Sequence, residues 1–334
     1  MKFLIAGLGS IGRRHLRNLL ALGQRDILLY RTGKSTLPET ELESFPVETE
    51  LQAALDHNPQ AVIVANPTAL HLQVALPAAE RGCHLLLEKP LSHSLEGIPE
   101  LRAAVQASGS RVLTGFQFRF HPALQEIKAL LAEEAIGKPL SVRAHWGEYL
   151  PGWHPWEDHR QSYSARPELG GGVILTLSHP LDYLRYLFGE VETLWAMTGQ
   201  HSSLDIDVED TAEIGLRFTS GLLGSLHLDY VQRPPSHHLE IVGAEGTLRW
   251  DNSDGIVHLF RASASAWESY ALPPGFERNS LFLAEMAHFL DMIGSNVPPF
   301  CSLDDGIRAL ELALAAHSSA RAAKPIHLAE HTRE

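Results

Sequence analysis

The stretch Gly7-Leu8-Gly9-Ser10-Ile11-Gly12 decides the fold, because it joins an apolar run to an amphipathic one. The run before it, Lys2-Ala6, has the composition of a buried β-strand, and Ile11-Leu22 after it has the spacing of an amphipathic helix. A G-x-G-x-x-G pattern carries a specific meaning only in such a strand-to-helix position. The sequence therefore predicts a dinucleotide-binding loop at the start of a doubly wound domain.

Each glycine of this loop meets a different steric need. Gly7 permits the tight turn, Gly9 lets backbone N–H groups approach a pyrophosphate, and Gly12 lets the helix pack closely on the strand. The partial positive charge of the helix N-terminus stabilises the phosphate there. The alternative is an ordinary glycine turn. We expect cofactor contacts from Gly7, Gly9, Ser10, Ile11 and Gly12.

The end of the second strand bears on the choice between NAD and NADP. About twenty residues beyond the glycine loop an NAD enzyme usually places Asp or Glu on the ribose 2'-hydroxyl. Here the chain reads Leu29-Tyr30-Arg31-Thr32-Gly33-Lys34, without a carboxylate. A guanidinium and an ammonium suit a 2'-phosphate, so NADP(H) is preferred and NAD(H) is the second possibility. Arg31, Thr32 and Lys34 are the predicted contacts, and a solvated turn is the alternative.

Short apolar runs alternate with amphipathic stretches through the first third of the chain. The strand-like runs are apolar throughout, as in parallel strands that helices cover on both faces. This pattern predicts an α/β Rossmann fold, a doubly wound parallel sheet. Its further expected strands are Asp26-Tyr30, Ala61-Ala65, His84-Leu87 and Arg111-Gly115, and its further helical stretches are Glu48-His57, Ala69-Arg81 and Ser94-Ser108.

The pattern changes near His121. A helix-like stretch, Pro122-Glu134, ends at Ile136-Gly137-Lys138-Pro139, and the strands after it alternate with period two. We predict a Rossmann domain over residues 1–120 and an α+β domain for substrate binding and oligomerisation over residues 121–334. The second domain should hold a large, mostly antiparallel open sheet. Its expected elements include strands Thr211-Phe218, Leu222-Asp229, His238-Val242 and Thr247-Asp251 and helices Ser280-Gly294 and Leu303-Ala322.

Charge and composition exclude several classes of function. A formal net charge of -13 over 334 residues, with no cluster of basic residues, disfavours nucleic acid and anionic membrane surfaces as partners. Gly7 and Gly9 interrupt the first apolar run before it could form a signal core, so we expect a cytoplasmic protein. The 19 histidines are scattered and the two cysteines, Cys83 and Cys301, are far apart, so no metal site is predicted.

Two further strand endings extend the case. They read Ala65-Asn66-Pro67-Thr68, with His71 shortly after, and Leu87-Glu88-Lys89-Pro90-Leu91. Together with the glycine loop they resemble the glucose-fructose oxidoreductase and inositol dehydrogenase family, known as Gfo/Idh/MocA. The likeness continues over almost the whole chain, through Gly115-Phe116-Gln117-Phe118-Arg119-Phe120-His121-Pro122, Gly170-Gly171-Gly172, His179 with Asp182, Glu209-Asp210-Thr211 and Gly243-Ala244-Glu245-Gly246-Thr247.

Lys89 is the main catalytic candidate. A lysine at the carboxyl end of a parallel strand, between an acid and a proline, can be partly desolvated and so suited to proton transfer. The resemblance implies that its ammonium lies near the reacting carbon–oxygen bond, where it also contacts substrate and cofactor. The alternative is a surface lysine paired with Glu88. The other cofactor contacts that we expect here are Asn66, Pro67, Thr68, His71 and Glu88, of which His71 fits helix packing equally well.

The second catalytic candidate is His179. The family usually has Asp four positions before this histidine, whereas here Leu175 stands four before it and Thr176 three before it. The spacing from His179 to Asp182 and to Leu187-Phe188-Gly189 is the familiar one, so the histidine carries over and the acid partner does not. A buried structural imidazole is the alternative. Asp182 should orient its neighbours, and Thr176 and His179 should face the substrate.

The loop from Trp146 to Tyr163 is rich in aromatic and hydrogen-bonding side chains. Aromatic rings stack on the apolar faces of sugars, and arginine binds hydroxyl or phosphate groups. Packing of the tryptophans at a sheet edge or a subunit interface is the alternative. The predicted substrate contacts are Arg119, Trp156, Arg160 and Tyr163, beside Lys89, Thr176 and His179.

These observations lead to one hypothesis and two rivals. We expect NADP(H)-dependent hydride transfer to or from a carbonyl or secondary alcohol of a sugar or nucleotide sugar, with Lys89 and His179 sharing the proton. One rival keeps the cofactor bound for a transient oxidation, with net elimination or glycoside cleavage. The other is a non-catalytic NADP-sensing protein. An open sheet face also predicts a homodimer or homotetramer.

Overall fold

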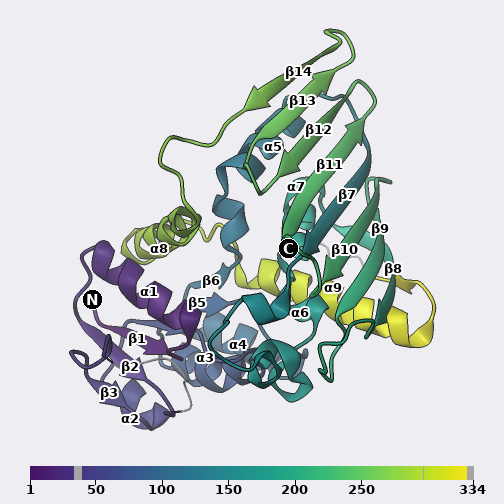
Figure 1. The fold of residues 1–334 in the computed structure, drawn as a ribbon. Helices are drawn as coiled ribbons and strands as arrows, with labels where there is room; N and C mark the ends of the chain where they lie inside the picture. The colour runs from purple at the N-terminus through teal and green to yellow at the C-terminus, as the bar shows by residue number, and fades with distance from the viewer. Residues whose placement is uncertain (34–39, 296, 329–334) are drawn as a thin grey trace. The chain divides into compact units, whose positions relative to one another are not determined.

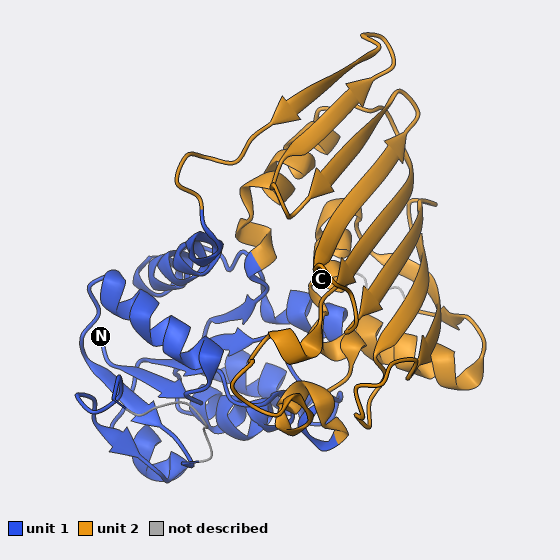
Figure 2. Ribbon diagram, viewed as in Figure 1, with its two compact units in different colours: residues 1–117, 168–170, 277–310 blue, residues 118–167, 171–276, 311–334 orange. Residues whose placement is uncertain are grey.

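The computed structural model describes residues 1–33, 40–295 and 297–328. The described chain divides into two compact units, each built from three segments (Figure 2). The first contains Met1–Gln117, Glu168–Gly170 and Glu277–Leu310. The second contains Phe118–Pro167, Gly171–Phe276 and Glu311–Glu334. The two predicted catalytic residues, Lys89 and His179, therefore belong to different units.

The first unit is built on a parallel sheet. Within the described residues its six strands follow the order β3-β2-β1-β4-β5-β6, and every neighbouring pair is parallel (Figure 1). The apolar runs of the sequence form these strands, so the predicted Rossmann fold is confirmed. The strands are β1 (Phe3–Ala6), β2 (Ile27–Tyr30), β3 (Val47–Glu48), β4 (Ala61–Val64), β5 (His84–Glu88) and β6 (Val112–Gly115), and the helices between them are α1 (Ser10–Ala21), α2 (Leu51–Asp56), α3 (His71–Glu80) and α4 (Ile98–Ser108).

A late helix completes the core of this unit. In α8 (Arg278–Gly294), Met286, Phe289 and Met292 are fully buried in the same apolar cluster as Phe3 and Ile5 of β1. The helix packs on α1, which it runs beside in Figure 1. The sequence-based division at residue 120 left this helix in the second domain, whereas it clusters with the first unit.

The second unit is built on a mostly antiparallel sheet, as predicted. Its described strands follow the order β14-β13-β12-β11-β7-β10-β9-β8-β15, and only β10 and β7 run parallel to each other. The strands are β7 (Pro139–Gly147), β8 (Val191–Gly199), β9 (Thr211–Phe218), β10 (Leu223–Asp229), β11 (Ser236–Gly243), β12 (Gly246–Asp251), β13 (Val257–Arg261), β14 (Ala266–Tyr270) and β15 (Ile326–His327). The helices of this unit are α5 (Pro122–Ala132), α6 (Val173–Thr176) and α7 (His179–Phe188), and α9 (Leu303–Ala322) begins in the first unit and ends in this one.

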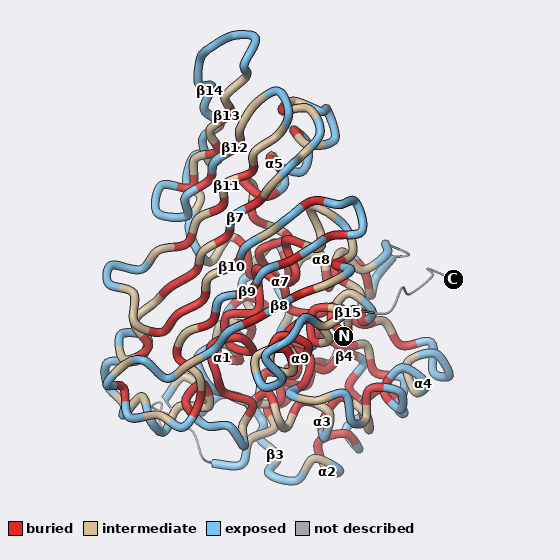
Figure 3. The backbone as a smooth tube through the Cα atoms, turned by 90° about the vertical axis from the view of Figure 1, so that its right-hand side faces the viewer, coloured by how far each residue is buried: buried red, intermediate tan, exposed pale blue. Residues whose placement is uncertain are grey.

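The two faces of this sheet differ in burial. Along β9 buried and exposed residues alternate, which places Ile214 and Leu216 on a covered face (Figure 3). Helix α5 packs on α7 and β13, and α6 packs on β9 and β10. The opposite face leaves large apolar side chains about half exposed. They are Trp195, Met197, Leu223 and Trp267.

Both cysteines lie within the described residues as buried free thiols. The Cys83 Sγ–H donates to the Pro59 carbonyl oxygen at 3.1 Å, in keeping with a packing role. No helix in the described part of the chain is long and apolar enough to cross a membrane.

Candidate active site

The glycine loop folds as tightly as its sequence predicts. Gly7 has φ +95°, and a Cβ there would lie 2.5 Å from the Asn66 nitrogen. A Cβ on Gly12 would lie 1.9 Å from the Gly7 carbonyl oxygen, so neither position accepts a side chain. A Cβ on Gly9 meets no atom within 4 Å. The loop thus leaves open space beside Gly9 at the N-terminus of α1, which fits a pyrophosphate on its backbone N–H groups.

The predicted 2'-phosphate contacts follow β2. The Arg31 backbone N–H donates to the Glu48 carbonyl oxygen at 3.1 Å, which fixes the chain beside β3. The Arg31 side chain is half-buried and Thr32 is exposed. Lys34 lies outside the described residues. The contact of these side chains with a phosphate stays a prediction.

The turn after β4 is held by its own side chains. The buried His71 ring bonds the Asn66 carbonyl oxygen through Nε2 at 2.9 Å, and the Asn66 side-chain amide donates to the Leu70 carbonyl oxygen at 3.0 Å. Burial lowers the pKa of His71. Thr68 is also buried, against Gly170. These bonds give His71 a structural task in the turn. Its contact with a cofactor stays a prediction, as do those of Asn66, Pro67 and Thr68.

Lys89 directly follows the end of β5, next to a Glu88 carboxyl that is held in place. The Glu88 carboxyl is buried, with Oε1 2.7 Å from His15 Nε2 and Oε2 accepting the Lys89 backbone N–H at 3.2 Å. It packs closely over Gly115, where a Cβ would lie 3.2 Å from it. Lys89 itself is half-buried. The Glu88 carboxyl is therefore a buried group and not a surface acid, and the catalytic role of Lys89 stays a prediction.

In the second unit, His179 begins α7 inside a group of rings. It is 2% exposed, and its ring stacks on Trp146 with centroids 5.4 Å apart. The rings of Phe118 and His179 meet in a T-shaped arrangement, with centroids 5.0 Å apart. Trp146 also stacks on His237 at 4.3 Å, and burial holds the pKa of His237 well below its usual range. These aromatic contacts help to fix the orientation of the His179 ring.

Arg119 and Asp182 form a buried ion pair. The guanidinium donates from Nε to Asp182 Oδ2 at 2.9 Å and from Nη2 to Oδ1 at 2.7 Å. The side chains are only 4% and 1% exposed. Asp182 thus orients a neighbour, as the sequence suggested. The predicted contact of Arg119 with substrate stays a prediction.

Thr176, the residue nearest to the family's acid position, is buried on α6. It lies close to Tyr230, whose hydroxyl donates to the Ser164 carbonyl oxygen at 3.2 Å. Glu209 fixes the preceding triple glycine. Its Oε1 accepts the Ile174 N–H at 3.2 Å, and a Cβ on Gly172 would lie 2.4 Å from that oxygen. Glu209 of the Glu-Asp-Thr motif therefore anchors the start of α6.

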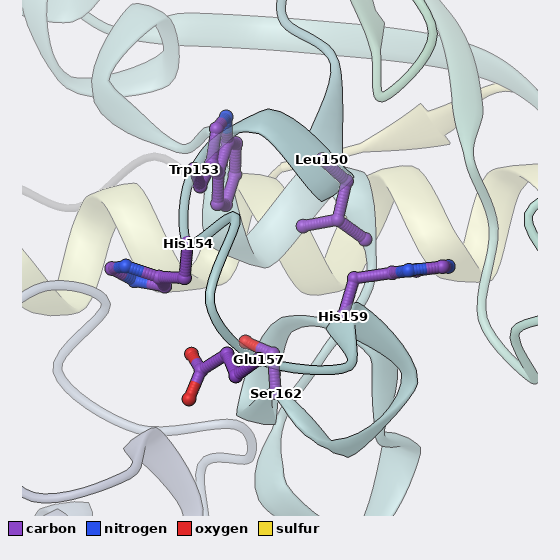
Figure 4. A pocket seen from close by; sticks show the side chains of 6 residues that line it. All are labelled: Leu150, Trp153, His154, Glu157, His159 and Ser162. Atoms are coloured by element: carbon purple, nitrogen blue, oxygen red, sulfur yellow. The ribbon is translucent and has the colours of Figure 1, made fainter. Parts of the chain in front are cut away.

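The aromatic loop surrounds a small hollow. Figure 4 shows its lining, which comprises Leu150, Trp153, His154, Glu157, His159 and Ser162. Trp156 is 63% exposed and so available for stacking. The Arg160 guanidinium is bound to Asp158 at 2.8 Å and to Asp205 at 3.1 Å, and its hydrogen bonds lower the pKa of Asp158 to about 2. A substrate group that binds the Arg160 guanidinium would therefore compete with these two carboxylates.

Comparison with known proteins assigns the chain to a family. Residues 1–116 match the oxidoreductase family with an NAD-binding Rossmann fold, and residues 124–249 match the GFO/IDH/MocA C-terminal domain. The 1,5-anhydro-D-fructose reductase of Ensifer adhaerens is 30% identical over 78% of this chain and 77% of its own length. The chain belongs to the Gfo/Idh/MocA family. It is therefore an NAD(P)-dependent oxidoreductase.

Further Gfo/Idh/MocA proteins are similar over the full length. The myo-inositol 2-dehydrogenase of Thermotoga maritima is 28% identical over 99% of both chains. A solved structure of levoglucosan dehydrogenase with NADH has a TM-score of 0.89 and 20% identity, covering 99% of this chain and all of its own. At that identity the structural likeness establishes the fold alone.

Several contacts within the two units of this Gfo/Idh/MocA protein were not predicted from the sequence. His15 lies three residues beyond Gly12, on α1, and its bond to Glu88 spans 73 residues. Tyr230 follows β10 without any motif around it. Trp146 was assigned to the loop, whereas it lies on β7 beneath His179. The motif Glu209-Asp210-Thr211 was recognised in the sequence, but its structural role was not predicted.

Proposed function

We propose that the chain transfers a hydride between NADP(H) and a carbonyl or secondary alcohol of a sugar or nucleotide sugar. The observation that carries this proposal is the half-buried Lys89, which directly follows a buried Glu88 that His15 orients, in the unit of the glycine loop. The activities named for the relatives from Ensifer and Thermotoga support a polyol or sugar as substrate class.

The residues divide the work as follows. The glycine loop and the turn after β4 bind the cofactor, which supplies or accepts the hydride when bound. Lys89 donates a proton to the substrate oxygen in the reducing direction and takes it back in the oxidising direction. His179 shares this proton or holds the substrate hydroxyl, and the exposed Trp156 stacks on the sugar ring. NADPH oxidation with a panel of keto-sugars and nucleotide sugars tests the reaction, and no turnover with any of them would count against it.

The cofactor preference is a separate prediction. NADPH should bind at least about tenfold more tightly than NADH, because one charge-assisted phosphate contact commonly contributes roughly 1.5–3 kcal/mol. Arg31→Ala should remove most of that difference, and fluorescence titration of both cofactors measures it. Arg81→Ala, at a surface ion pair of the same unit, is the matched control. Equal affinities, or unchanged NADPH binding by Arg31→Ala, would place Arg31 in a solvated turn.

The exposed apolar face of the second sheet predicts self-association. Trp195, Met197, Leu223 and Trp267 lie on it at about half exposure, and such faces usually mark an interface. Light scattering at micromolar concentration should give a homodimer or homotetramer, and Trp195→Glu with Met197→Glu should lower the mass. Leu95→Glu alters an exposed leucine of the first unit and serves as the control. A monomeric wild type would contradict this prediction and leave the active-site proposal intact.

A further inference from the structure

Three ionisable side chains meet in the interior of the first unit. They are His15 on α1, Glu88 at the end of β5 and Glu285 on α8, here called the buried carboxyl cluster. One ligating atom from each lies within 4.8 Å of those of the other two. His15 and Glu285 are fully buried and Glu88 is 6% exposed. Two carboxyl groups therefore share a space that water does not reach.

The two carboxyl groups are not equivalent. Glu88 has one oxygen bonded to His15 and the other to the Lys89 backbone N–H. Neither oxygen of Glu285 has a hydrogen-bond partner among the described residues. An ionised carboxylate without any donor is too costly to bury, whereas the protonated acid is not. Burial, together with the charge of Glu88, accordingly holds the pKa of Glu285 well above its usual range.

Charged and titratable groups on three helices face the cluster. The positive charge of Arg14 on α1 is attracted by the Glu88 carboxylate and repelled by the Arg278 guanidinium on α8. The buried His71 on α3 also interacts electrostatically with Glu88. Phe282 of α8 packs against the α1 side of the cluster. The Arg14 guanidinium lies 4.4 Å from the centre of the Phe282 ring, and the Phe282 and His15 rings meet in a T-shaped arrangement.

We propose that Glu285 is a positioning residue for the reaction. Its proton keeps the buried carboxyl cluster at a single negative charge on Glu88, which His15 orients directly before Lys89. When Glu285 loses that proton at alkaline pH, a second negative charge forms behind Glu88 and holds the Lys89 ammonium charged. This role rests on the proposed function of Lys89, whereas the buried proton itself does not.

The first test measures the proton without any activity. An unfolded Glu285 ionises near its ordinary pKa, so above about pH 5 unfolding releases a proton that only the folded wild type holds. Relative to Glu285→Gln, which holds no such proton, the wild-type folding constant should therefore fall about tenfold per pH unit until Glu285 ionises in the folded state. Urea unfolding of the full chain between pH 5 and 8 measures this. A ratio that does not change with pH would overturn the proposal.

Controls make this result specific. Glu100→Gln alters an exposed acid of the same unit on α4, and its folding constant should keep a fixed ratio to that of the wild type. Glu285→Leu cannot ionise either and replaces the glutamine variant if that variant does not fold. Infrared spectroscopy of the wild type should show a carboxylic-acid band that both Glu285 variants lack. A stoichiometric divalent metal in the wild type that is lost from the variants would mean that an ion, not a proton, neutralises the cluster.

The second test links Glu285 to Lys89. The alkaline limb of the kcat/KM profile for carbonyl reduction should move about one pH unit lower in Glu285→Gln, because the second charge no longer forms. At a pH on that limb, turnover is then about tenfold lower than in the wild type. An unmoved limb would overturn the positioning role. Should Lys89 prove dispensable, the proposed function fails, and the unfolding and infrared results still decide whether Glu285 holds the proton.

Discussion

Replacing Lys89 with methionine should lower turnover about 10²–10⁴-fold, the usual contribution of general acid–base assistance. Methionine keeps the length of the apolar stem but can neither donate nor accept the proton at the substrate oxygen. NADPH affinity should stay nearly unchanged, because the glycine loop and the Glu88–His15 contact are untouched. Steady-state rates, with cofactor binding measured separately by fluorescence, distinguish the two effects.

Two further variants sharpen this test. Lys89→Arg keeps the positive charge but does not release a proton at working pH, so its turnover should also be low. Lys138→Met removes an exposed lysine ahead of β7 and should leave turnover as it is. Normal turnover in Lys89→Met would defeat the proposed mechanism, whatever the cofactor.

Breaking the buried pair between Arg119 and Asp182 should have the largest effect on stability. Asp182→Asn leaves the Arg119 guanidinium 4% exposed without its carboxylate, and an uncompensated buried charge commonly costs about 3–5 kcal/mol. The thermal midpoint should fall by roughly 6–20 °C for a unit of this size. Thermal and urea unfolding of the full chain give the two values.

The double substitution Arg119→Met with Asp182→Leu tests the reason for that loss. Apolar side chains of similar volume can replace a buried ion pair at little cost, so the double variant should recover most of the stability. If Asp182→Asn instead unfolds as the wild type does, the pair is exposed to water in solution and contributes little.

The elements of the first unit were predictable because their signals are local. The glycine loop, the apolar strands and the helix after each strand are read within a few neighbouring residues, and the strand near Ala61 was placed almost to its ends. The antiparallel sheet followed from period-two alternation in the same way. The motif at Lys89 was found because its three residues are contiguous.

The contacts that were missed join distant residues. Glu88 bonds His15 across 73 residues, and Glu285 reaches the same cluster from α8 near the other end of the chain. Arg160 was expected to be available for a ligand, whereas Asp158 and Asp205 bind its guanidinium. No periodicity in the sequence reports such pairings, because they depend on how complete elements pack together.

The position of α8 in the first unit has a consequence for synthesis on the ribosome. The apolar core around Phe3 is incomplete until Met286, Phe289 and Met292 pack against it. These three residues leave the ribosome only when the chain is nearly complete. Roughly 190 residues separate Gln117 from Leu310, which at 5–20 residues per second takes about 10–40 s. During that interval the nascent first unit exposes part of its core. Chaperones that bind nascent chains should meet it there, and a fragment that ends near residue 117 should aggregate.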